Sequence, residues 1–280
     1  MDMAQLSSLT AVLKENISKV IMGKEEEIEK ILLVSLFCGG HILLEDLPGT
    51  GKTTLAKALA RSLDCSFKRI QFTPDLLPSE LTGINYYNQK EQAFQFRPGA
   101  IFTNILLADE INRATPRTQS SLLECMEEHQ CSVDGVTYPM TQPFLVVATQ
   151  NPVGSAGTQL LPESQLDRFM MRLSIGYPSL DQEVLILKQT EGGRPVDSLR
   201  QVATLEEVRQ MQAETAQVHV AEDLYRYVAT LCAATREQAE RAVGYIGKNC
   251  TLIETDTSDH AIHNVHADVY LDAVDQLLPQ

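Results

Sequence analysis

The stretch His41-Ile-Leu-Leu-Glu-Asp-Leu-Pro-Gly-Thr-Gly-Lys-Thr-Thr-Leu55 decides the fold. Its first five residues form a short apolar run before a Pro-Gly turn, and this pattern predicts a buried strand. From Thr53 to Leu63 the apolar residues recur at helical spacing. A strand, a glycine-containing turn and a helix in this order make one βα unit.

The turn fits the phosphate-loop pattern G-x-x-x-x-G-K-[ST] except at its first position. Glycines let the backbone curl so that successive N–H groups point at phosphates, and the following helix start adds partial positive charge. Lys52 is expected to contact the β- and γ-phosphates, and the Thr53 hydroxyl to coordinate magnesium. Asp46 replaces the first glycine, and aspartate tolerates a left-handed backbone better than most residues. The predicted nucleotide-binding residues are Asp46, Pro48, Gly49, Thr50, Gly51, Lys52, Thr53 and Thr54.

A second apolar run, Ile101 to Ala108, ends in the acids Asp109 and Glu110. An apolar strand that delivers an acid at its C-terminal end is the magnesium-anchoring partner of a phosphate loop. We expect Asp109 to hold Mg²⁺ through water and Glu110 to polarise the attacking water as a general base. Many strands end in solvated acids, but the upstream phosphate loop favours the catalytic interpretation.

Two more polar positions follow predicted elements. The apolar run 144–149 delivers Asn151 to the nucleotide cleft, where a neutral amide can orient water or sense the γ-phosphate. Asn-Pro is also an ordinary turn signal. Arg168 lies near the end of a short predicted helix, where a guanidinium can stabilise a transferring phosphoryl group in cis or in trans. The alternative for Arg168 is a salt bridge with Asp167 or Glu163.

The remaining sequence alternates strands and helices. Helical spacing covers residues 1–40 and 118–128. The expected strands are 41–45, 67–72, 101–108, 144–149 and 172–177, with a short helix over 163–171. This alternation predicts an α/β domain with a five-stranded parallel sheet and helices on both faces. Residues 74–98 are too many for an ordinary connection, so we expect an insertion with its own hairpin.

From Ser179 onward only helices are expected, over 184–189, 205–214 and 224–235. We therefore predict three parts: an α/β domain over 1–178, a smaller helical domain over 179–248 and an atypical tail over 249–280.

Composition limits the partners. The 280 residues carry 23 Lys and Arg against 37 Asp and Glu, a formal net charge of −14. Nucleic acid and anionic membranes are bound by clustered cations, so this charge argues against both as partners.

No apolar run approaches the roughly 18–20 residues that span a bilayer, so we expect no membrane insertion. The N-terminus lacks the pattern of a signal peptide, which predicts a cytoplasmic location. None of the six cysteines forms a C-x-x-C pair, and we expect buried thiols.

These motifs, in this order, resemble those of AAA+ ATPases, specifically the MoxR family. The similar segments are Leu44–Thr53, Phe72–Gly83, Phe96–Gly99, Leu107–Ala114, Ala148–Pro152 and Leu161–Phe169. The resemblance covers residues 10–240 and implies an AAA+ P-loop core with a small C-terminal helical lid. It implies that Asn151 is sensor 1 and that Arg168 is an arginine finger for a neighbouring subunit in a ring, usually a hexamer. Residues 76–98 resemble the helix-2 insertion of this clade, and Asp46 in place of glycine is typical of the family.

The resemblance also implies a function. MoxR-like proteins are thought to act as chaperones that remodel or mature partners, which often carry a von Willebrand A domain or receive metal cofactors. We therefore expect an ATPase that uses ATP and Mg²⁺, with Thr53 and Asp109 on the metal. The expected catalytic residues are Lys52, Glu110, Asn151 and Arg168.

Three other functions are alternatives to an ATP-hydrolysing chaperone. One is a nucleotide-gated binding module with little turnover. A DNA-directed motor is disfavoured by the negative charge, and a GTPase by the absence of an Asn-Lys-x-Asp motif.

The chain departs from the family pattern after Glu237. The family continues with a Gly-Ala-Ser-Pro-Arg-like turn, whose arginine is sensor 2, and a long helix. Here Lys248 falls where that arginine is expected. Three interpretations compete: a divergent lid with a weaker lysine sensor, a metal site in the tail, or a reading-frame shift over residues 244–251. The metal site would use His260, His263, Asp259 and Asp268.

Overall fold

The computed structural model describes residues 3–46, 49–150, 161–190 and 193–237. Five strands form one sheet in the order β2-β5-β8-β1-β9, and every pairing in it is parallel. The strands are β1 Ile42–Glu45, β2 Phe67–Gln71, β5 Ile105–Asp109, β8 Leu145–Gln150 and β9 Met171–Leu173. The predicted five-stranded parallel sheet is confirmed. Since all five strands point the same way, their carboxyl ends meet at one edge of the sheet.

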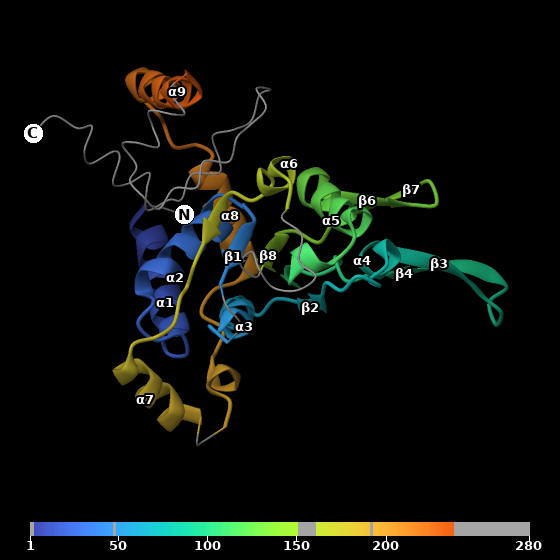
Figure 1. Cartoon of the computed structure of the whole chain (residues 1–280), viewed down its shortest axis with the longest axis horizontal. Coiled ribbons are helices and arrows are strands. Elements are labelled where there is room, and N and C mark those ends of the chain that lie inside the picture. The colour runs from blue at the N-terminus through green and yellow to red at the C-terminus, as the bar shows by residue number, and fades with distance from the viewer. Residues whose placement is uncertain (1–2, 47–48, 151–160, 191–192, 238–280) are drawn as a thin grey trace, which may run out of the picture.

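Helices cover both faces of this sheet, as the alternation predicted (Figure 1). Successive strand residues point to opposite faces, so Ile42 and Leu44 join one apolar cluster and Leu43 joins the other. The first cluster packs under α1 Met3–Ser18, α2 Glu25–Leu32, the π-helical turn η1 Leu33–Phe37, α3 Lys52–Leu63 and α8 Leu205–Thr215. The second packs under α5 Pro116–Glu128. The central strands β1, β5 and β8 are buried on both faces and are therefore almost continuously apolar.

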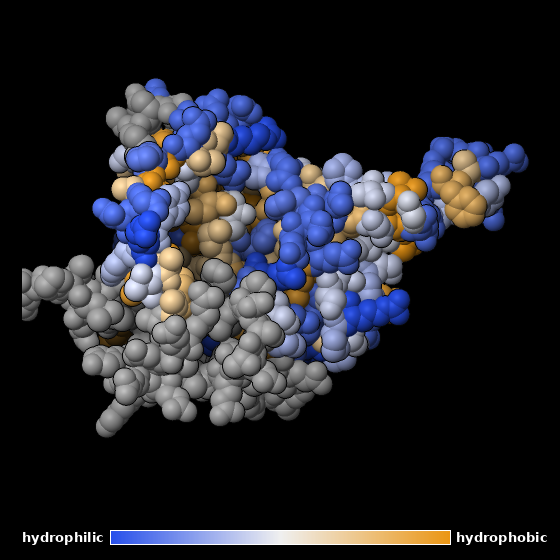
Figure 2. Space-filling view, turned by 90° about the horizontal axis from the view of Figure 1, so that it is seen from above, coloured by the Kyte–Doolittle hydropathy of each residue, from blue (hydrophilic) through white to orange (hydrophobic). Residues whose placement is uncertain are grey.

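Two antiparallel hairpins stand outside the main sheet. The short helix α4 Pro78–Thr82 leads into β3 Gly83–Asn88 and β4 Ala93–Pro98, which is the hairpin expected within the insertion. It projects from the body (Figures 1 and 2). Its side chains Tyr87 and Phe94 are exposed and lie in edge-to-face contact with each other. The second hairpin, β6 Gln130–Val133 with β7 Val136–Pro139, was not predicted.

Several element boundaries differ from the prediction. The helix expected over 163–171 is the short α6 Glu163–Leu166, because the chain then turns and the Met170 N–H donates to the His41 carbonyl at 2.9 Å. The last strand begins at Met171 and ends at Leu173 rather than covering 172–177. Its end is fixed because the next N–H groups, of Ile175 and Gly176, donate to the Asp46 carboxylate. The third sheet strand begins at Ile105 rather than Ile101, since residues 101–103 form a turn.

Only helices follow Ser179 in the described part of the chain, as expected. They are α7 Leu180–Thr190, the 3₁₀ turn η3 Pro195–Ser198, α8 and α9 Glu222–Glu237. Val208 and Met211 of α8 belong to the core beneath α1–α3, whereas α7 buries no residue. The domain limits at 179 and 249 remain predictions. Lys248 and the tail histidines lie outside the described residues.

Two other expectations concern membranes and cysteines. Within the described ranges, no helix combines the length and apolar character needed to cross a bilayer. The five described cysteines are all free, but only Cys125 and Cys131 are buried, while Cys38 is exposed. The expectation of uniformly buried thiols is therefore wrong, because Cys38 comes just after η1 at the surface.

Candidate nucleotide site

The predicted loop connects β1 to α3 at the carboxyl edge of the sheet. Gly49 and Gly51 have φ of 92° and 86°, in the left-handed region that favours glycine. A Cβ on Gly49 would meet nothing within 4 Å, so the backbone conformation and not crowding requires glycine there. Gly51 is the N-cap of α3 and contributes no side chain to the helix start. The N–H groups of the first turn, Lys52 to Thr54, therefore point out of the helix end toward the loop. Pro48 lies outside the described residues.

Lys52 folds back over this loop. Its side chain is 9% exposed, and its Nζ donates to the main-chain carbonyl of Asp46 at 2.7 Å. Burial lowers the pKa of Lys52, while the charges of Asp46, Asp109 and Glu110 oppose that shift. The loop lysine and the two acids at the end of β5 thus act on one another electrostatically.

The side chain of Asp46 points to the chain beyond β9. Its carboxylate accepts hydrogen bonds from the Ser174 hydroxyl at 2.7 Å, the Ile175 N–H at 2.7 Å and the Gly176 N–H at 2.9 Å. Positive φ within the described part of the loop falls on the glycines, not on Asp46. The tolerance of aspartate for a left-handed backbone is therefore not used at this position. Asp46 instead fastens the start of the loop to the chain that follows β9.

Asp109 is held from both sides at the end of β5. One carboxylate oxygen accepts from Arg69 on β2, at 2.5 Å from Nη2 and 3.2 Å from Nε. The other accepts from the Thr149 hydroxyl on β8 at 2.6 Å. Because β2 and β8 flank β5, each neighbouring strand supplies one of these contacts. The carboxylate is therefore fixed in orientation.

Glu110 follows with φ 55° and ψ 47°, a left-handed conformation that is uncommon for a residue with a side chain. Its N–H donates to the Thr149 hydroxyl at 2.9 Å. The 3₁₀ turn η2 Ile111–Arg113 comes next, and Arg113 donates to the Glu110 carboxylate at 2.6 Å. This turn directs Glu110 away from the strand path, and strained backbone of this kind clusters at functional sites.

Several known proteins are similar in sequence to this chain. A profile of the ATPase family associated with various cellular activities (AAA) matches residues 41–171. The uncharacterized protein YeaC of Bacillus subtilis is 46% identical over 82% of this chain and 72% of its own length. Chaperone MoxR1 of Mycobacterium tuberculosis is 40% identical over 79% of this chain and 58% of its own length. Protein MoxR of Paracoccus denitrificans is 30% identical over 93% of this chain and 81% of its own length.

The chain belongs to the MoxR family of AAA+ ATPases. A crystal structure from Cytophaga hutchinsonii, described as that of a candidate ATPase, superposes with a TM-score of 0.74 at 38% identity. It covers 86% of this chain and 75% of that one. The predicted family and the AAA+ α/β fold are confirmed, and this MoxR-family protein binds and hydrolyses ATP.

The structure describes some of the other predicted site residues of this MoxR-family chain but not all of them. Asn151 lies outside the described residues. Its neighbour Gln150 donates to Glu45 at 3.1 Å, and Arg172 of β9 pairs with the same carboxylate. Arg168 forms an ion pair with Glu127 of α5, which is neither of the partners considered from the sequence. Thr53 and Thr54 are partly exposed in the first turn of α3.

Two residues of the site were not predicted from the MoxR-family sequence. Arg69 and Thr149 both contact Asp109 from neighbouring strands. Thr149 ends an otherwise apolar run, and Arg69 interrupts a short strand next to Lys68. A polar side chain near the carboxyl end of a buried parallel strand is the signal that could have indicated Thr149. Arg69 lies in the middle of the partly exposed β2, where a polar residue is ordinary and gives no such signal.

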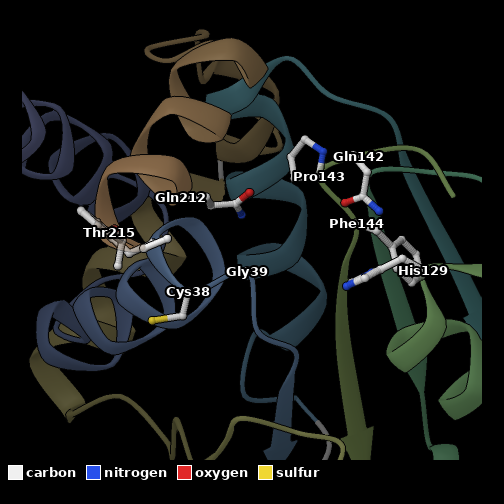
Figure 3. A pocket seen from close by; sticks show the side chains of 10 residues that line it. Cys38, Gly39, His129, Gln142, Pro143, Phe144, Gln212 and Thr215 are labelled. Atoms are coloured by element: carbon white, nitrogen blue, oxygen red, sulfur yellow. The ribbon is translucent and has the colours of Figure 1, made fainter. Parts of the chain in front are cut away.

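One pocket of this MoxR-family structure lies away from the loop. It has a volume of about 330 Å³ and is lined by Gln212 and Thr215 of α8 on one side and by His129 and Phe144 on the other (Figure 3). Gly39 and Phe144 lie before β1 and β8 begin, so this pocket is at the amino edge of the sheet, opposite the loop. None of the predicted site residues lines it.

Proposed function

We propose that ATP binds at the carboxyl edge of the sheet and that its hydrolysis drives remodelling or maturation of a partner protein. The strand order supports this location most directly. Only β8 lies between β1, which leads into the glycine loop, and β5, which ends in Asp109. A triphosphate on the loop therefore faces the acids across one strand. The buried ammonium of Lys52, subject to the charges of both acids, supports this arrangement.

The loop would hold the phosphates in two ways. Main-chain N–H groups of Gly49 to Thr54 and the start of α3 supply partial positive charge without a side chain in the way. Lys52 supplies a full charge to the β- and γ-phosphates. Lys52 already bonds to the loop carbonyl of Asp46, so little side-chain freedom is lost on binding.

The residues present fit a magnesium ion. Thr53 offers a hydroxyl and Asp109 a carboxylate, which are the hard oxygen ligands that Mg²⁺ takes. Both Asp109 oxygens already accept hydrogen bonds from the chain, which supports contact with the metal through water. When bound, Mg²⁺ neutralises charge that develops on the phosphate oxygens.

We assign the catalytic roles of Glu110, Asn151 and Arg168 from their positions in the chain. Glu110 would act as the general base that polarises the attacking water, with Asn151 orienting that water at the end of β8. Arg168 would complete the site of a neighbouring subunit, which requires a ring, and we infer a hexamer. Because Arg168 is paired with Glu127 within its own chain, assembly would exchange that pair for contact with the nucleotide.

The partner is inferred from the family. The relative from Mycobacterium tuberculosis is named a chaperone, and we infer that this chain also acts on proteins, such as those with a von Willebrand A domain or a metal cofactor. Residues 179–248 would form the lid over the nucleotide. A cytoplasmic location fits this role, and the net charge of −14 disfavours nucleic acid as the substrate.

A trap experiment tests both halves of the proposal. Glu110→Gln protein is immobilised with ATP and Mg²⁺, incubated with cell extract, and the captured proteins and the assembly mass are measured. Lys52→Ala protein, treated identically, is the control. We expect a hexamer and a specific partner only with Glu110→Gln. A single-chain mass in ATP would contradict the ring, and equal capture by both variants would contradict nucleotide-dependent binding.

Phosphate release separates this function from the alternative. Steady-state turnover of the unmodified chain supports an ATP-driven machine. ATP binding with almost no phosphate release, even in the assembled state, would instead favour a nucleotide-gated binding module.

A further inference from the structure

We propose that Thr149 is a positioning residue whose hydroxyl sets the geometry of Asp109 and Glu110 together. The proposal rests on the catalytic roles proposed above for those two acids. Its basis is one oxygen atom: the Thr149 Oγ1 donates to Asp109 at 2.6 Å and accepts from the Glu110 N–H at 2.9 Å.

Sheet register places this hydroxyl. Ala108 of β5 pairs with Ala148 of β8, so the next residues along the two strands, Asp109 and Thr149, lie side by side. Thr149 is 1% exposed, and water has almost no access to its side chain. A hydroxyl held in this way cannot exchange its protein partners for solvent, so its two bonds stay fixed in direction.

The direction of both hydrogen bonds is determined. A hydroxyl has one proton, and a carboxylate such as that of Asp109 only accepts. The proton of Thr149 therefore points at Asp109, and the oxygen lone pairs are left for the Glu110 N–H. One side chain thus orients the proposed metal-binding carboxylate and the main chain of the proposed base.

The Glu110 main chain needs such a partner. A left-handed backbone is strained at a residue with a Cβ, and Glu110 has φ 55°. Its carbonyl accepts from the Arg113 N–H at 2.9 Å and its carboxylate accepts from the Arg113 guanidinium. The bond from the Glu110 N–H to Thr149 ties the turn to the neighbouring strand β8. Without it, the strained turn is free to relax and move the carboxylate.

Asp109 would respond as well. With the Thr149 hydroxyl removed, Arg69 remains as the described side-chain donor to that carboxylate, on the side of β2. The Asp109 carboxylate would then rotate toward Arg69 and away from its present position beside the start of the Glu110 turn. ATP binding depends on the loop and Lys52, so it should change little.

The test compares variants at position 149 that differ by the hydroxyl. Thr149→Ser and Thr149→Ala both lose the methyl group, and only the first keeps the oxygen; Thr149→Val keeps the shape and loses the oxygen. We expect Thr149→Ala and Thr149→Val to lower kcat by about 10–100-fold, as loss of a supporting hydrogen bond around a metal site does. The ATP KM should stay within about 3-fold, the Mg²⁺ concentration for half-maximal rate should rise, and Thr149→Ser should recover most of the rate.

Thr118→Val is the matched control. Thr118 of α5 is also fully buried, and its hydroxyl donates to the Leu76 carbonyl at 2.8 Å. It should lose stability without the change in Mg²⁺ dependence. The proposal is overturned if Thr149→Ala turns over at the wild-type rate, if Thr149→Ser is as slow as Thr149→Ala, or if Thr118→Val shows the same kinetic change. If Thr149→Val does not fold, the Ser and Ala pair still decides. Absent turnover in the unmodified chain would refute the proposed function instead.

Discussion

The side-chain ammonium of Lys52 donates a hydrogen bond to the main-chain carbonyl of Asp46 at 2.7 Å, across the loop that separates the two residues. Lys52 begins α3 and Asp46 follows β1, so this contact closes the loop on itself. Asp46 is in turn fixed to Ser174, Ile175 and Gly176 beyond β9. The lysine is therefore positioned by two strands of the sheet as well as by its own helix.

Replacing Lys52 with alanine should weaken ATP binding by about 100-fold. Charge-assisted hydrogen bonds contribute roughly 1.5–3 kcal/mol, and each 1.4 kcal/mol is a tenfold change in affinity. Titration with a fluorescent ATP analogue measures the effect. Lys57→Ala removes a lysine from the middle of the same helix and should bind ATP normally. Equal affinity of the two variants would contradict the role assigned to Lys52.

Replacing Asp46 with asparagine should lower the free energy of unfolding by about 2–3 kcal/mol, because hydrogen bonds to a charged acceptor are of that size. The amide keeps one acceptor oxygen, and its NH₂ group would face an N–H donor of the 174–176 segment. Urea denaturation measures the change. Ser174→Ala removes one of the three donors and should cost less. Unaltered stability of Asp46→Asn would show that these contacts are not important for the fold.

The sequence predicted the sheet well because buried parallel strands are nearly continuous apolar runs. β1, β5 and β8 each stand out in this way and each ends in a polar residue. The hairpin β6–β7 was missed, although Asp134-Gly135 at its turn has φ of 51° and 79°, the conformation that such a dipeptide favours. Its strands are short and half exposed, so they carry no strong apolar pattern.

The site was predicted only in part, for a physical reason. Lys52, Asp109 and Glu110 belong to local motifs whose chemistry depends on chain order. Thr149 and Arg69 belong to the site because strands far apart in sequence lie in register, and one sequence does not specify that register. Asp46 is the converse case: its position in the motif is local, but its three partners come from residues 174–176.

Replacing Glu110 with glutamine should preserve ATP binding and reduce phosphate release by at least about 100-fold, since a general base contributes about 10²–10⁴ in rate. The amide keeps the size of the side chain but cannot accept the proton of the attacking water. Phosphate release and ATP affinity are measured on the same preparation. Glu124→Gln, on the exposed side of α5, is the charge-matched control. An unimpaired rate in Glu110→Gln would refute the assignment of the base.

Protonation of His41 should destabilise the fold in acid. Its Nδ1 accepts from the Val146 N–H at 3.0 Å, so Nε2 carries the proton and donates to the Met126 carbonyl at 3.2 Å. Burial lowers the pKa of His41 from 6.5 to about 4. Between these two values the unfolded chain binds more protons than the folded chain, so stability is complete above pH 6.5 and declines as the pH falls toward 4. From pH 7 to pH 5 the expected loss from this one group is about 2 kcal/mol, measured by urea denaturation.

His41→Gln should be less stable at pH 7 but should lack this part of the decline, whereas His219→Gln, at an exposed histidine, should retain it. The same decline in wild type and His41→Gln would mean that other groups cause the acid sensitivity.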